Sequence, residues 1–340
     1  MHFSFGLIAL VAGLLGTVVN SIEAAKNVKI CAKCSYKTIN SALASLPNDA
    51  TTYNLLLYPG IYHEQVKIRR NNVNLKPMQP GFVQIEYNGF KDTQRTNGTN
   101  EDSATLSVFG TNVKVYDMTI ANLFPQNGGM ANLALNLAAT QASFYNVKFY
   151  GYQDTLLVNR GATGFFKKCY VEGSVDYIWG EGTAVFEHST IATNRKGGYA
   201  TAHRRGTADS AGGFFFNSCY IKATLPSGPL VATQDRTVAF TSSSQFPNSW
   251  FLGRPWNEFA RVVYRYCNID DSVKVEGWSK WDSAVKDYKN VNFGEYKNSG
   301  AGQWNSKRVT FSHQITDAEN AKYSTAALFG SAPWIDTTYQ

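Results

Sequence analysis

Asn146-Val147-Lys148-Phe149 is followed 22 residues later by Lys168-Cys169-Tyr170-Val171, a segment of the same character. Both follow an aromatic or β-branched run, and the pattern extends along much of the chain. Six segments share it, at intervals of 29, 22, 20, 30 and 48 residues: Asp117–Ile120, Asn146–Phe149, Lys168–Val171, His188–Ile191, Ser218–Ile221 and Tyr266–Ile269. Coils of about 20 residues, some lengthened by insertions, are typical of a solenoid whose turns stack on one another. The repeat therefore predicts an all-β fold, a parallel β-helix.

Two carboxylates have the spacing of one such coil. Asp154 lies in Gly151-Tyr152-Gln153-Asp154-Thr155-Leu156 and Asp176 in Val175-Asp176-Tyr177-Ile178-Trp179-Gly180, 22 residues further on. Equivalent residues of paired strands lie about 4.8 Å apart, so we expect the two side chains to face each other across adjacent coils. Two carboxyl groups that close titrate as a pair, one driven toward the neutral acid while the other stays charged. Either segment alone would more often be an ordinary turn and strand, but their spacing and order favour a site.

Other segments predict how the solenoid is completed. Apolar residues in Thr38–Leu46 are spaced for one short helix that ends before Pro47 and caps the first coil. A second helix is predicted over Asp317–Leu328, closing or flanking the other end. Strand-like runs lie between them, including Tyr53–Tyr58, Val113–Ile120, Phe144–Phe149 and Val263–Ile269.

The N-terminus reads as a leader for secretion. Phe5–Val19 is apolar and uncharged, and about 15 residues are too few for a membrane span of roughly 20. We predict a signal peptide over residues 1–21, with cleavage as late as residue 25, and an uncleaved anchor as the alternative. Residues 26–340 form one predicted domain, because no Pro-rich, Ser-rich or like-charge run interrupts them. Asn97-Gly98-Thr99 is a glycosylation acceptor that fits an extracellular protein.

The five cysteines are too few for a disulfide scaffold. Cys169, Cys219 and Cys267 share one phase of the repeat, which favours burial in the solenoid interior. Cys31 and Cys34 form a lone Cys-x-x-Cys pair without a nearby histidine, so a zinc site is not expected, and a local disulfide is open to them in an oxidising compartment.

The net charge of +7 and a pI near 9.0 suit an acidic polymer as partner. Nucleic acid is excluded as the preferred one, because the sequence has no nucleic-acid motif and no Lys/Arg run longer than two. No stretch beyond the N-terminal run is long and apolar enough to predict a membrane span.

Four motifs together resemble the pectin methylesterase (pectinesterase) family, with downstream segments similar to fungal or microbial members. They are Gly60-Ile61-Tyr62-His63-Glu64, Gly151–Leu156, Val175–Gly180 and Leu252-Gly253-Arg254-Pro255-Trp256. The resemblance runs from about residue 27 to 330. It implies a right-handed, single-stranded parallel β-helix with short capping helices and an open cleft. It also implies a monomer that hydrolyses the methyl esters of polygalacturonate without metal or cofactor, with a proteinaceous inhibitor as a further partner.

The resemblance and the side-chain chemistry assign the same roles. Asp176 attacks the ester carbonyl, and Arg254 holds it as a carboxylate through a bidentate contact. Asp154 is the general acid for departing methanol and then the base for water. Gln153 donates an amide hydrogen to the oxyanion. Substrate contacts are expected from Trp256, Trp179 and Val175.

Two positions depart from the family pattern. Ala131 stands where the family has a second oxyanion glutamine, and such a loss costs about 10²- to 10³-fold in rate. We therefore expect Ala131→Gln to raise kcat, unless Asn132, Gln126 or Gln141 substitutes; strand alternation argues against Asn132. His203 replaces a common glutamine, which predicts altered substrate contacts or pH response.

Two other functions compete with an active esterase. A weakly active or inactive pectin-binding homologue is the first, because of Ala131. A pectate lyase is the second, and it is disfavoured because that chemistry calls for clustered Ca²⁺-binding acids. Four further tryptophans are predicted to be structural, since their spacing does not point to a cleft: Trp278, Trp281, Trp304 and Trp334.

Overall fold

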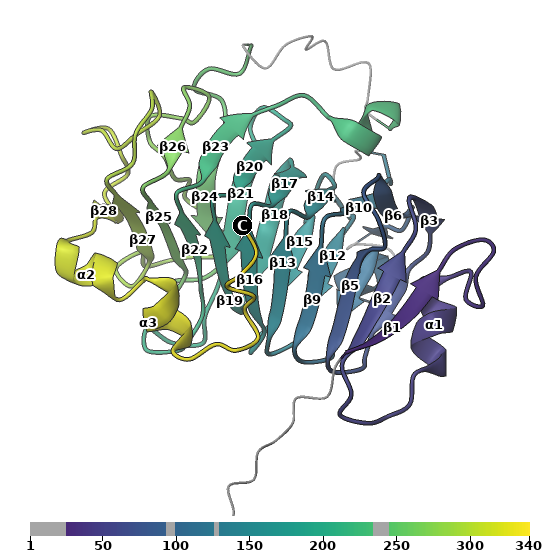
Figure 1. Cartoon of the computed structure of the whole chain (residues 1–340). Helices are drawn as coiled ribbons and strands as arrows, with labels where there is room; N and C mark the ends of the chain where they lie inside the picture. Colours follow the sequence, from purple (N-terminus) through teal and green to yellow (C-terminus); the bar gives the residue numbers. More distant parts are fainter. Residues whose placement is uncertain (1–24, 93–98, 126–128, 234–244) are drawn as a thin grey trace, which may run out of the picture.

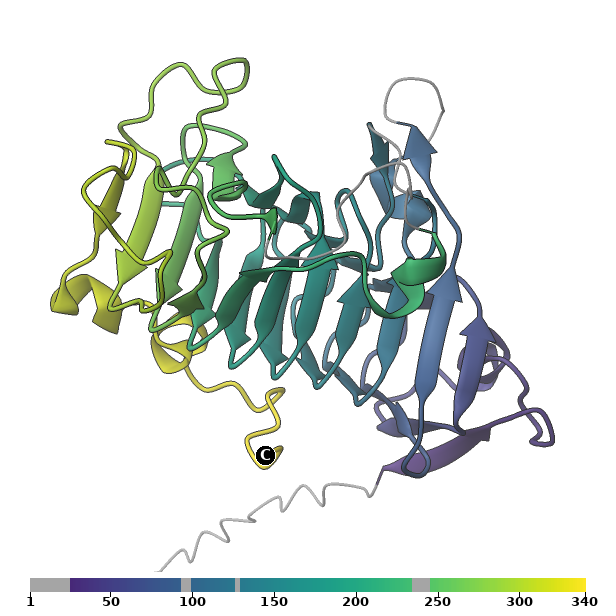
Figure 2. The same cartoon turned by 90° about the horizontal axis from the view of Figure 1, so that it is seen from above.

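The computed structural model describes residues 25–92, 99–125, 129–233 and 245–340. The predicted signal peptide, the glycosylation acceptor Asn97 and the candidate donor Gln126 lie outside these ranges. Figure 1 shows the described chain as stacked coils, and Figure 2 shows the same coils from above. The predicted β-helix is therefore confirmed.

The strands of the described chain fall into three long parallel sheets. The first runs β1 (Lys26–Ile30), β2 (Tyr53–Leu57), β5 (Val73–Pro77), β9 (Val113–Tyr116), β13 (Ala142–Tyr145), β16 (Thr163–Lys167), β19 (Thr183–Glu187), β22 (Gly213–Asn217), β25 (Arg261–Arg265), β27 (Asn292–Tyr296) and β28 (Ser312–Gln314). The second runs β3 (Gly60–His63), β6 (Val83–Tyr87), β10 (Thr119–Asn122), β14 (Lys148–Tyr150), β17 (Tyr170–Gly173), β20 (Thr190–Thr193), β23 (Tyr220–Ala223) and β26 (Asn268–Ile269). The third runs β4 (Val66–Ile68), β8 (Leu106–Val108), β12 (Leu135–Leu137), β15 (Leu156–Val158), β18 (Val175–Gly180), β21 (Tyr199–His203) and β24 (Phe251–Pro255). A short antiparallel pair, β7 (Lys91–Asp92) and β11 (Met130–Ala131), stands apart from them.

The repeated segments of the sequence are the corners between the first and second sheets. Their first residues all have left-handed backbones, with φ from 50° to 55°: Asp117, Asn146, Lys168, His188, Ser218 and Tyr266. A single left-handed residue turns an extended chain sharply. The predicted runs Val113–Ile120, Phe144–Phe149 and Val263–Ile269 are therefore two strands each, joined at a corner. Continuous strands were the wrong prediction there, because apolar alternation continues across the bend.

Aromatic rings stack along the interior of the solenoid, one from each coil. Neighbouring ring centroids lie 4.3–4.8 Å apart and the planes are within 13° of parallel along the ladder Phe144, Phe166, Phe186, Phe216, Tyr264. Cys169, Cys219 and Cys267 are buried beside this ladder as free thiols, as predicted. The register between coils equals the sequence interval, so side chains of equal phase lie above one another.

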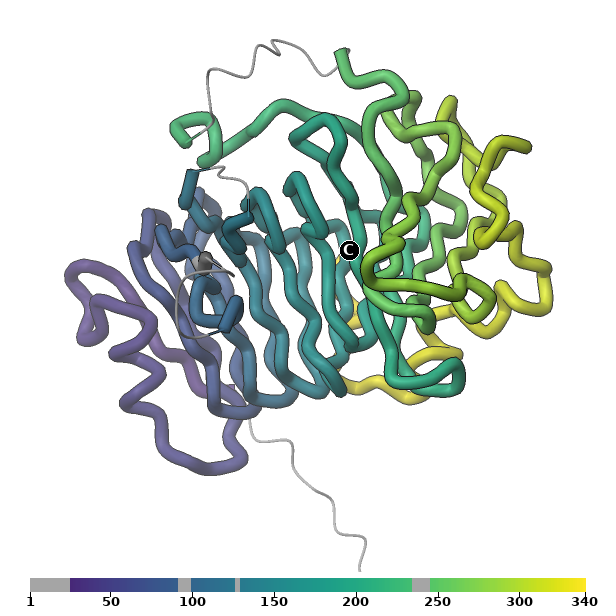
Figure 3. Tube along the Cα trace, turned by 180° about the vertical axis from the view of Figure 1, so that it is seen from behind, coloured from purple at the N-terminus to yellow at the C-terminus, as the bar shows by residue number. Residues whose placement is uncertain are grey.

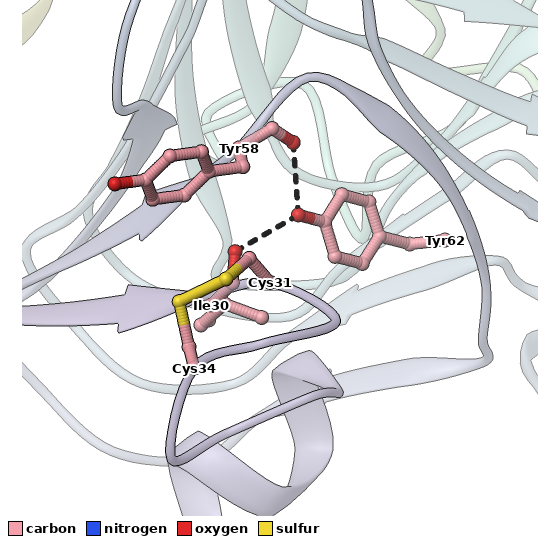
Figure 4. Close-up of a disulfide and its surroundings, with 5 residues drawn as sticks. All are labelled: Ile30, Cys31, Cys34, Tyr58 and Tyr62. Atoms are coloured by element: carbon pink, nitrogen blue, oxygen red, sulfur yellow. Dashed lines mark hydrogen bonds between the residues drawn. A yellow bond between two sulfur atoms is a disulfide. The ribbon is translucent and has the colours of Figure 1, made fainter.

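Helix α1 (Ile39–Ser45) packs against the first coil, within one residue of the predicted bounds at each end. Thr38 caps it, and the carboxylate of Glu64 accepts from the N–H groups of Ile39 at 2.7 Å and Asn40 at 3.0 Å. A carboxylate is favourable at a helix N-terminus. In the preceding loop, Cys31 and Cys34 form a disulfide (Figure 4). None of the helices in the described ranges is long and apolar enough to cross a bilayer.

The C-terminal segment lies along the outer face of the first sheet rather than over the end of the solenoid. The predicted helix Asp317–Leu328 is divided into α2 (Asp317–Ala321) and α3 (Thr325–Phe329), because Ser324 begins a new helix as its N-cap. Leu328, Phe329 and Trp334 pack on aromatic and aliphatic side chains of that face. The tail then runs back past earlier coils, where the Tyr339 hydroxyl contacts Asp117 (Figures 1 and 3).

Candidate active site

Asp154 and Asp176 are aligned across adjacent coils, as the 22-residue spacing predicts. Gln153 is paired with Val175 and Leu156 with Ile178, and the Asp154 N–H donates to the Val175 carbonyl at 3.0 Å. Both aspartates have left-handed backbones, with φ of 63° and 50°. Asp176 also lies where the register between β18 and β21 shifts. Such irregularities redirect a side chain and are concentrated at functional sites.

Arg254 binds the carboxylate of Asp176 through two hydrogen bonds from its guanidinium group. Nε lies 2.9 Å from Oδ1 and Nη2 lies 2.6 Å from Oδ2. Aromatic rings flank the guanidinium, with Tyr199 4.2 Å and Trp281 3.7 Å from its central carbon. The bidentate geometry is that of a strong charge-assisted pair. Trp281, which is predicted to be structural, thus packs on the arginine that binds Asp176.

The two carboxyl groups differ in their electrostatic surroundings. Burial raises the pKa of Asp154 well above its usual value, the charge of Asp176 raises it further, and Arg254 opposes both. The pKa of Asp176 is also raised, because burial outweighs the hydrogen bonds and charge of Arg254, which act directly on the carboxylate and lower it. Asp154 therefore holds its proton more strongly than Asp176, so that within the pair Asp176 ionises first and Asp154 is the acid.

This assignment predicts that Asp154→Asn raises stability increasingly with pH. A carboxyl group whose pKa is raised by folding lowers stability once the pH rises above its unfolded value, near 3.9. Below that pH both states carry the neutral acid, so the variant should melt like the wild type. Above it the wild type loses stability up to the raised pKa, and the asparagine variant does not. Thermal melts at pH 3.5 and pH 7.5 test this, and an equal difference in Tm at both values would contradict it.

The two tryptophans predicted to contact substrate lie together beside the pair. The rings of Trp179 and Trp256 meet edge to face with centroids 5.5 Å apart. The indole N–H of Trp179 donates to the Asp154 carbonyl at 3.1 Å. Both rings line a groove of about 310 Å³ together with Asn100, Glu101, Leu157, Asn159, Arg160, Gly180, Glu181 and Arg204. The groove lies beside the pair, because two of its lining residues, Trp179 and Asn100, hydrogen-bond to Asp154.

Strand alternation explains which side chains reach the groove. In the third sheet Leu157, Trp179, Ala202 and Arg254 occupy one register row, which points outward. The small Ala202 between Trp179 and Arg254 leaves space over the strands for both larger side chains. Gln153 and Val175, which precede the aspartates in their motifs, are both half-exposed. The predicted site residues are therefore gathered on one face of the solenoid.

Ala131 is buried rather than open to the groove. It lies in an apolar cluster with Ala104, Leu133 and Leu157, and Trp179 packs against that cluster. A glutamine there would have to displace packed apolar groups, and overpacking of this kind costs about 1–3 kcal/mol. Ala131 therefore belongs to the packed apolar floor of the site and is not an open position for a donor side chain.

Two of the proposed substitutes for that glutamine are engaged elsewhere. Asn132 is buried and turned inward, donating to the Phe124 carbonyl at 3.2 Å and accepting from the Tyr152 N–H at 3.3 Å. Gln141 is exposed in a turn and accepts from the Thr111 hydroxyl. Neither residue lines the groove beside Trp179 and Trp256.

His203 does not contact the groove, contrary to the expectation of altered substrate contacts. It lies in the inward-pointing row of β21, is fully buried, and packs edge-on against Phe214. Its Nδ1 accepts from the Arg261 N–H at 3.0 Å. Burial lowers its pKa to about 3. The imidazole is therefore a neutral part of the interior and not a pH switch in the physiological range.

Three residues of the site could not be identified from sequence. Trp281 supports Arg254 as described above. Arg204 lies over the Trp256 ring at 4.2 Å and forms an ion pair of 2.6 Å with Glu181. Asn100 directs its side-chain amide to Asp154, with Nδ2 3.4 Å from Oδ2. Only the stacking of distant segments brings these three residues to the site.

Comparisons with known proteins place this site in a family. The pectinesterase family model matches residues 27–332. Pectinesterase 31 of Arabidopsis thaliana is 30% identical over 294 residues, covering 84% of this chain and 85% of its own. Probable pectinesterase/pectinesterase inhibitor 64 of the same plant is 29% identical over 90% of this chain, which spans about half of that protein's length.

A solved structure agrees with these matches. The pectin methylesterase from Aspergillus niger superposes with a TM-score of 0.78 at 26% identity, over 93% of this chain and 98% of that one. Its right-handed parallel β-helix is the fold described above. The aspartate pair, the arginine and the aromatic groove lie within the matched residues. This protein accordingly belongs to the pectinesterase family of carboxylic ester hydrolases.

Proposed function

We propose that this protein demethylates pectin through Asp176 as nucleophile, yielding methanol and free galacturonate carboxylates. One observation carries the proposal: a buried pair of carboxyl groups of which only Asp176 is held by the bidentate Arg254. A pair with unlike surroundings supplies both a charged nucleophile and a neutral acid at one pH.

The first half of the reaction forms an acyl-enzyme. An Asp176 oxygen bonds to the ester carbonyl carbon, and the carbonyl π electrons move to its oxygen. Donors directed at that oxygen, Gln153 among them, stabilise the charge. The tetrahedral intermediate then collapses, its C–O bond to the methoxy group breaks, and Asp154 transfers its proton so that methanol leaves.

The second half restores the enzyme. Asp154, now a carboxylate, takes a proton from a water molecule whose oxygen attacks the carbonyl carbon of the acyl-enzyme. The bond to Asp176 breaks, and the sugar leaves as a free acid. The negative charge that returns to Asp176 is stabilised by Arg254, whose bidentate contact is already in place, so little reorganisation is needed. The aromatic rings of Trp179 and Trp256 pack on the sugar and hold the ester in line, and Val175 contacts it beside the nucleophile.

The alternatives are distinguished by their products. Purified protein incubated with highly methylated pectin should release methanol without unsaturated ends. Unsaturated ends that require Ca²⁺ would identify a lyase. Binding to pectin with no methanol release would identify an inactive homologue, and either result would overturn the proposal.

Surface charge predicts that binding to demethylated pectin weakens as salt rises. The chain carries +7, and both Arg160 and Arg204 line the groove, where they share the single carboxylate of Glu181. Exposed charges are screened beyond about 8 Å at physiological salt. We expect Kd for pectate to rise at least about tenfold between 20 mM and 300 mM NaCl. Neutral, fully methylated pectin is the control, and its Kd should respond much less to salt. An equal salt dependence of Kd for the two polymers would show that the basic groove does not contribute to substrate binding.

We further propose that the protein acts outside the cell as a glycosylated monomer, released by cleavage of its leader near residue 21 to 25. The apolar run Phe5–Val19, the acceptor at Asn97 and the disulfide between Cys31 and Cys34 support an oxidising route. Intact mass before and after deglycosylation, with N-terminal sequencing of the secreted form, tests it. A proteinaceous inhibitor, if one binds, should compete with pectin at the groove.

A further inference from the structure

The side-chain amide of Asn100 is the feature that neither the motifs nor the family assignment explains. Asn100 begins the 3₁₀ helix η1 (Asn100–Ser103), at the edge of the groove and half-buried. Its Nδ2 lies 3.4 Å from Oδ2 of Asp154. This hydrogen bond is long for an amide. Contacts of catalytic groups are often long in a substrate-free enzyme and tighten when the substrate binds.

η1 is held firmly against the floor of the site. Thr99 and Asp102 form a capping box around its first turn. The Leu133 N–H donates to the Ser103 hydroxyl at 3.2 Å, and buried Asn122 donates to the Ser103 carbonyl at 2.9 Å. Gln65 donates to the Asp102 carbonyl at 2.7 Å. Asn100 is therefore presented by a fixed element, as a preorganised donor requires.

The amide has a hydrogen to spare. Nδ2 carries two hydrogens, and within the described part of the chain Asp154 is the only partner of this group. The other hydrogen is available to the groove, where the ester lies against Asp154. Ala131 lies in the same apolar cluster as Ala104, which is four residues beyond Asn100. Leu157 of this cluster and Trp179, which packs against it, both line the groove. Asn100 lines that groove too, so a side-chain amide is present beside the cluster that contains Ala131.

We propose that Asn100 is the second amide donor of this esterase. It binds the ester oxygen as negative charge develops there, and it holds Asp154 toward the leaving methoxy group. This inference rests on the proposed function and adds a residue to it. It also explains why Ala131 is compatible with catalysis.

The test is Asn100→Ala in the full-length protein, assayed for methanol release. We expect kcat to fall about 10²- to 10³-fold, as for loss of one oxyanion donor, while KM changes less than about threefold, because the contact forms mainly in the transition state. Asn100→Asp keeps the shape without the donor and should lose at least as much. Asn27→Ala, which removes an exposed amide on β1, is the matched control and should keep wild-type rates.

The pH profile separates this role from a structural one. A donor to Asp154 stabilises its carboxylate, so Asn100→Ala should raise the pKa of Asp154 and move the alkaline limb of kcat/KM to higher pH. A mere loss of folded protein would lower the profile without moving it. Asn100→Ala and Asn100→Asp that both keep kcat within threefold of wild type, or an unmoved alkaline limb, would overturn the proposal.

Ala131→Gln in the wild-type background supplies an independent outcome. With Asn100 as donor, a well-folded variant should gain less than about threefold in kcat. A gain of tenfold or more would show that the second donor is missing, and it would overturn the assignment of Asn100. The proposed function itself is tested separately by Asp176→Asn, whose activity does not depend on which amide binds the oxyanion.

Discussion

Asp176→Asn is expected to reduce methanol release by at least about 10⁴-fold, the scale of losing a nucleophilic or triad residue. The amide keeps the size of the side chain and can still accept from Arg254, so the substrate groove and the fold should persist. It cannot act as the attacking carboxylate, and no acyl-enzyme forms. Initial rates on methylated pectin, together with a thermal melt of the same sample, measure the two effects separately.

Asp271→Asn is the matched control for this variant. Asp271 is exposed, and among the described residues its one hydrogen bond is through its backbone carbonyl, which accepts from the Asn248 N–H. The same chemical change there should leave the rate unaltered. A rate for Asp176→Asn above a few per cent of wild type, in protein free of contaminating esterase, would assign the nucleophile to another group.

Removal of Arg254 should have the next largest effect. Loss of one partner from a buried ion pair costs about 3–5 kcal/mol, which corresponds to roughly 10² to 5 × 10³ in an equilibrium or rate. Asp176 avoids this cost by taking up a proton, which destroys the nucleophile. Arg254→Met should therefore lose activity over that range at neutral pH. Arg254→Lys keeps a positive charge but loses the bidentate contact and the packing between Tyr199 and Trp281. Its activity is therefore expected to lie between that of the wild type and that of Arg254→Met.

The pH dependence of Arg254→Met has a definite sign. Activity requires ionised Asp176, so the acidic limb of kcat/KM follows the pKa of that group. Arg254 lowers this pKa against the effect of burial. Without the arginine the pKa rises, the acidic limb moves to higher pH, and the variant should recover part of its activity as the pH increases. A uniform loss at every pH would mean that Arg254 acts on the substrate rather than on Asp176.

Variants of Arg254 and Trp281 together distinguish two roles for Trp281: supporting Arg254, or contacting the sugar. If Trp281 acts through Arg254, then Trp281→Leu should displace the acidic limb in the same direction by a smaller amount. It should add little to Arg254→Met in the double variant, because residues acting through one group are not additive. Independent, additive losses would place Trp281 in contact with the sugar instead.

The coil length of the sequence determined the centre of the site. In a solenoid the interval between equivalent residues becomes the register between neighbouring strands, so 22 residues between Asp154 and Asp176 were enough to align them. Interior positions followed for the same reason, as the buried thiols of Cys169, Cys219 and Cys267 show. The apolar spacing before Pro47 located α1 to within a residue, since both signals involve only neighbouring positions.

The bends and the edges of the groove were decided by tertiary structure. Left-handed corners at residues such as Asn146 and Lys168 carry no glycine to mark them, so strands were predicted to run through them. Strand alternation, by contrast, could have placed His203 inside, because it is two residues from the inward Thr201 and pairs with Pro255. Its role was misjudged from the resemblance rather than from the pattern.

Asn100 and Trp281 reach the site through insertions between coils, whereas Arg204 directly follows β21. Asn100 is 54 residues from Asp154, and Arg254 is 78 residues from Asp176. Periodicity fixes the position of a side chain along a strand, but it does not fix the path of the loops that bring Asn100 and Trp281 over the strands. That path depends on packing, as in the anchoring of η1 by Asn122 and Ser103. The sequence thus determined that Asp154 and Asp176 meet. The tertiary structure decided which side chains bind them, influence their ionisation and line the groove beside them, because loop paths depend on packing.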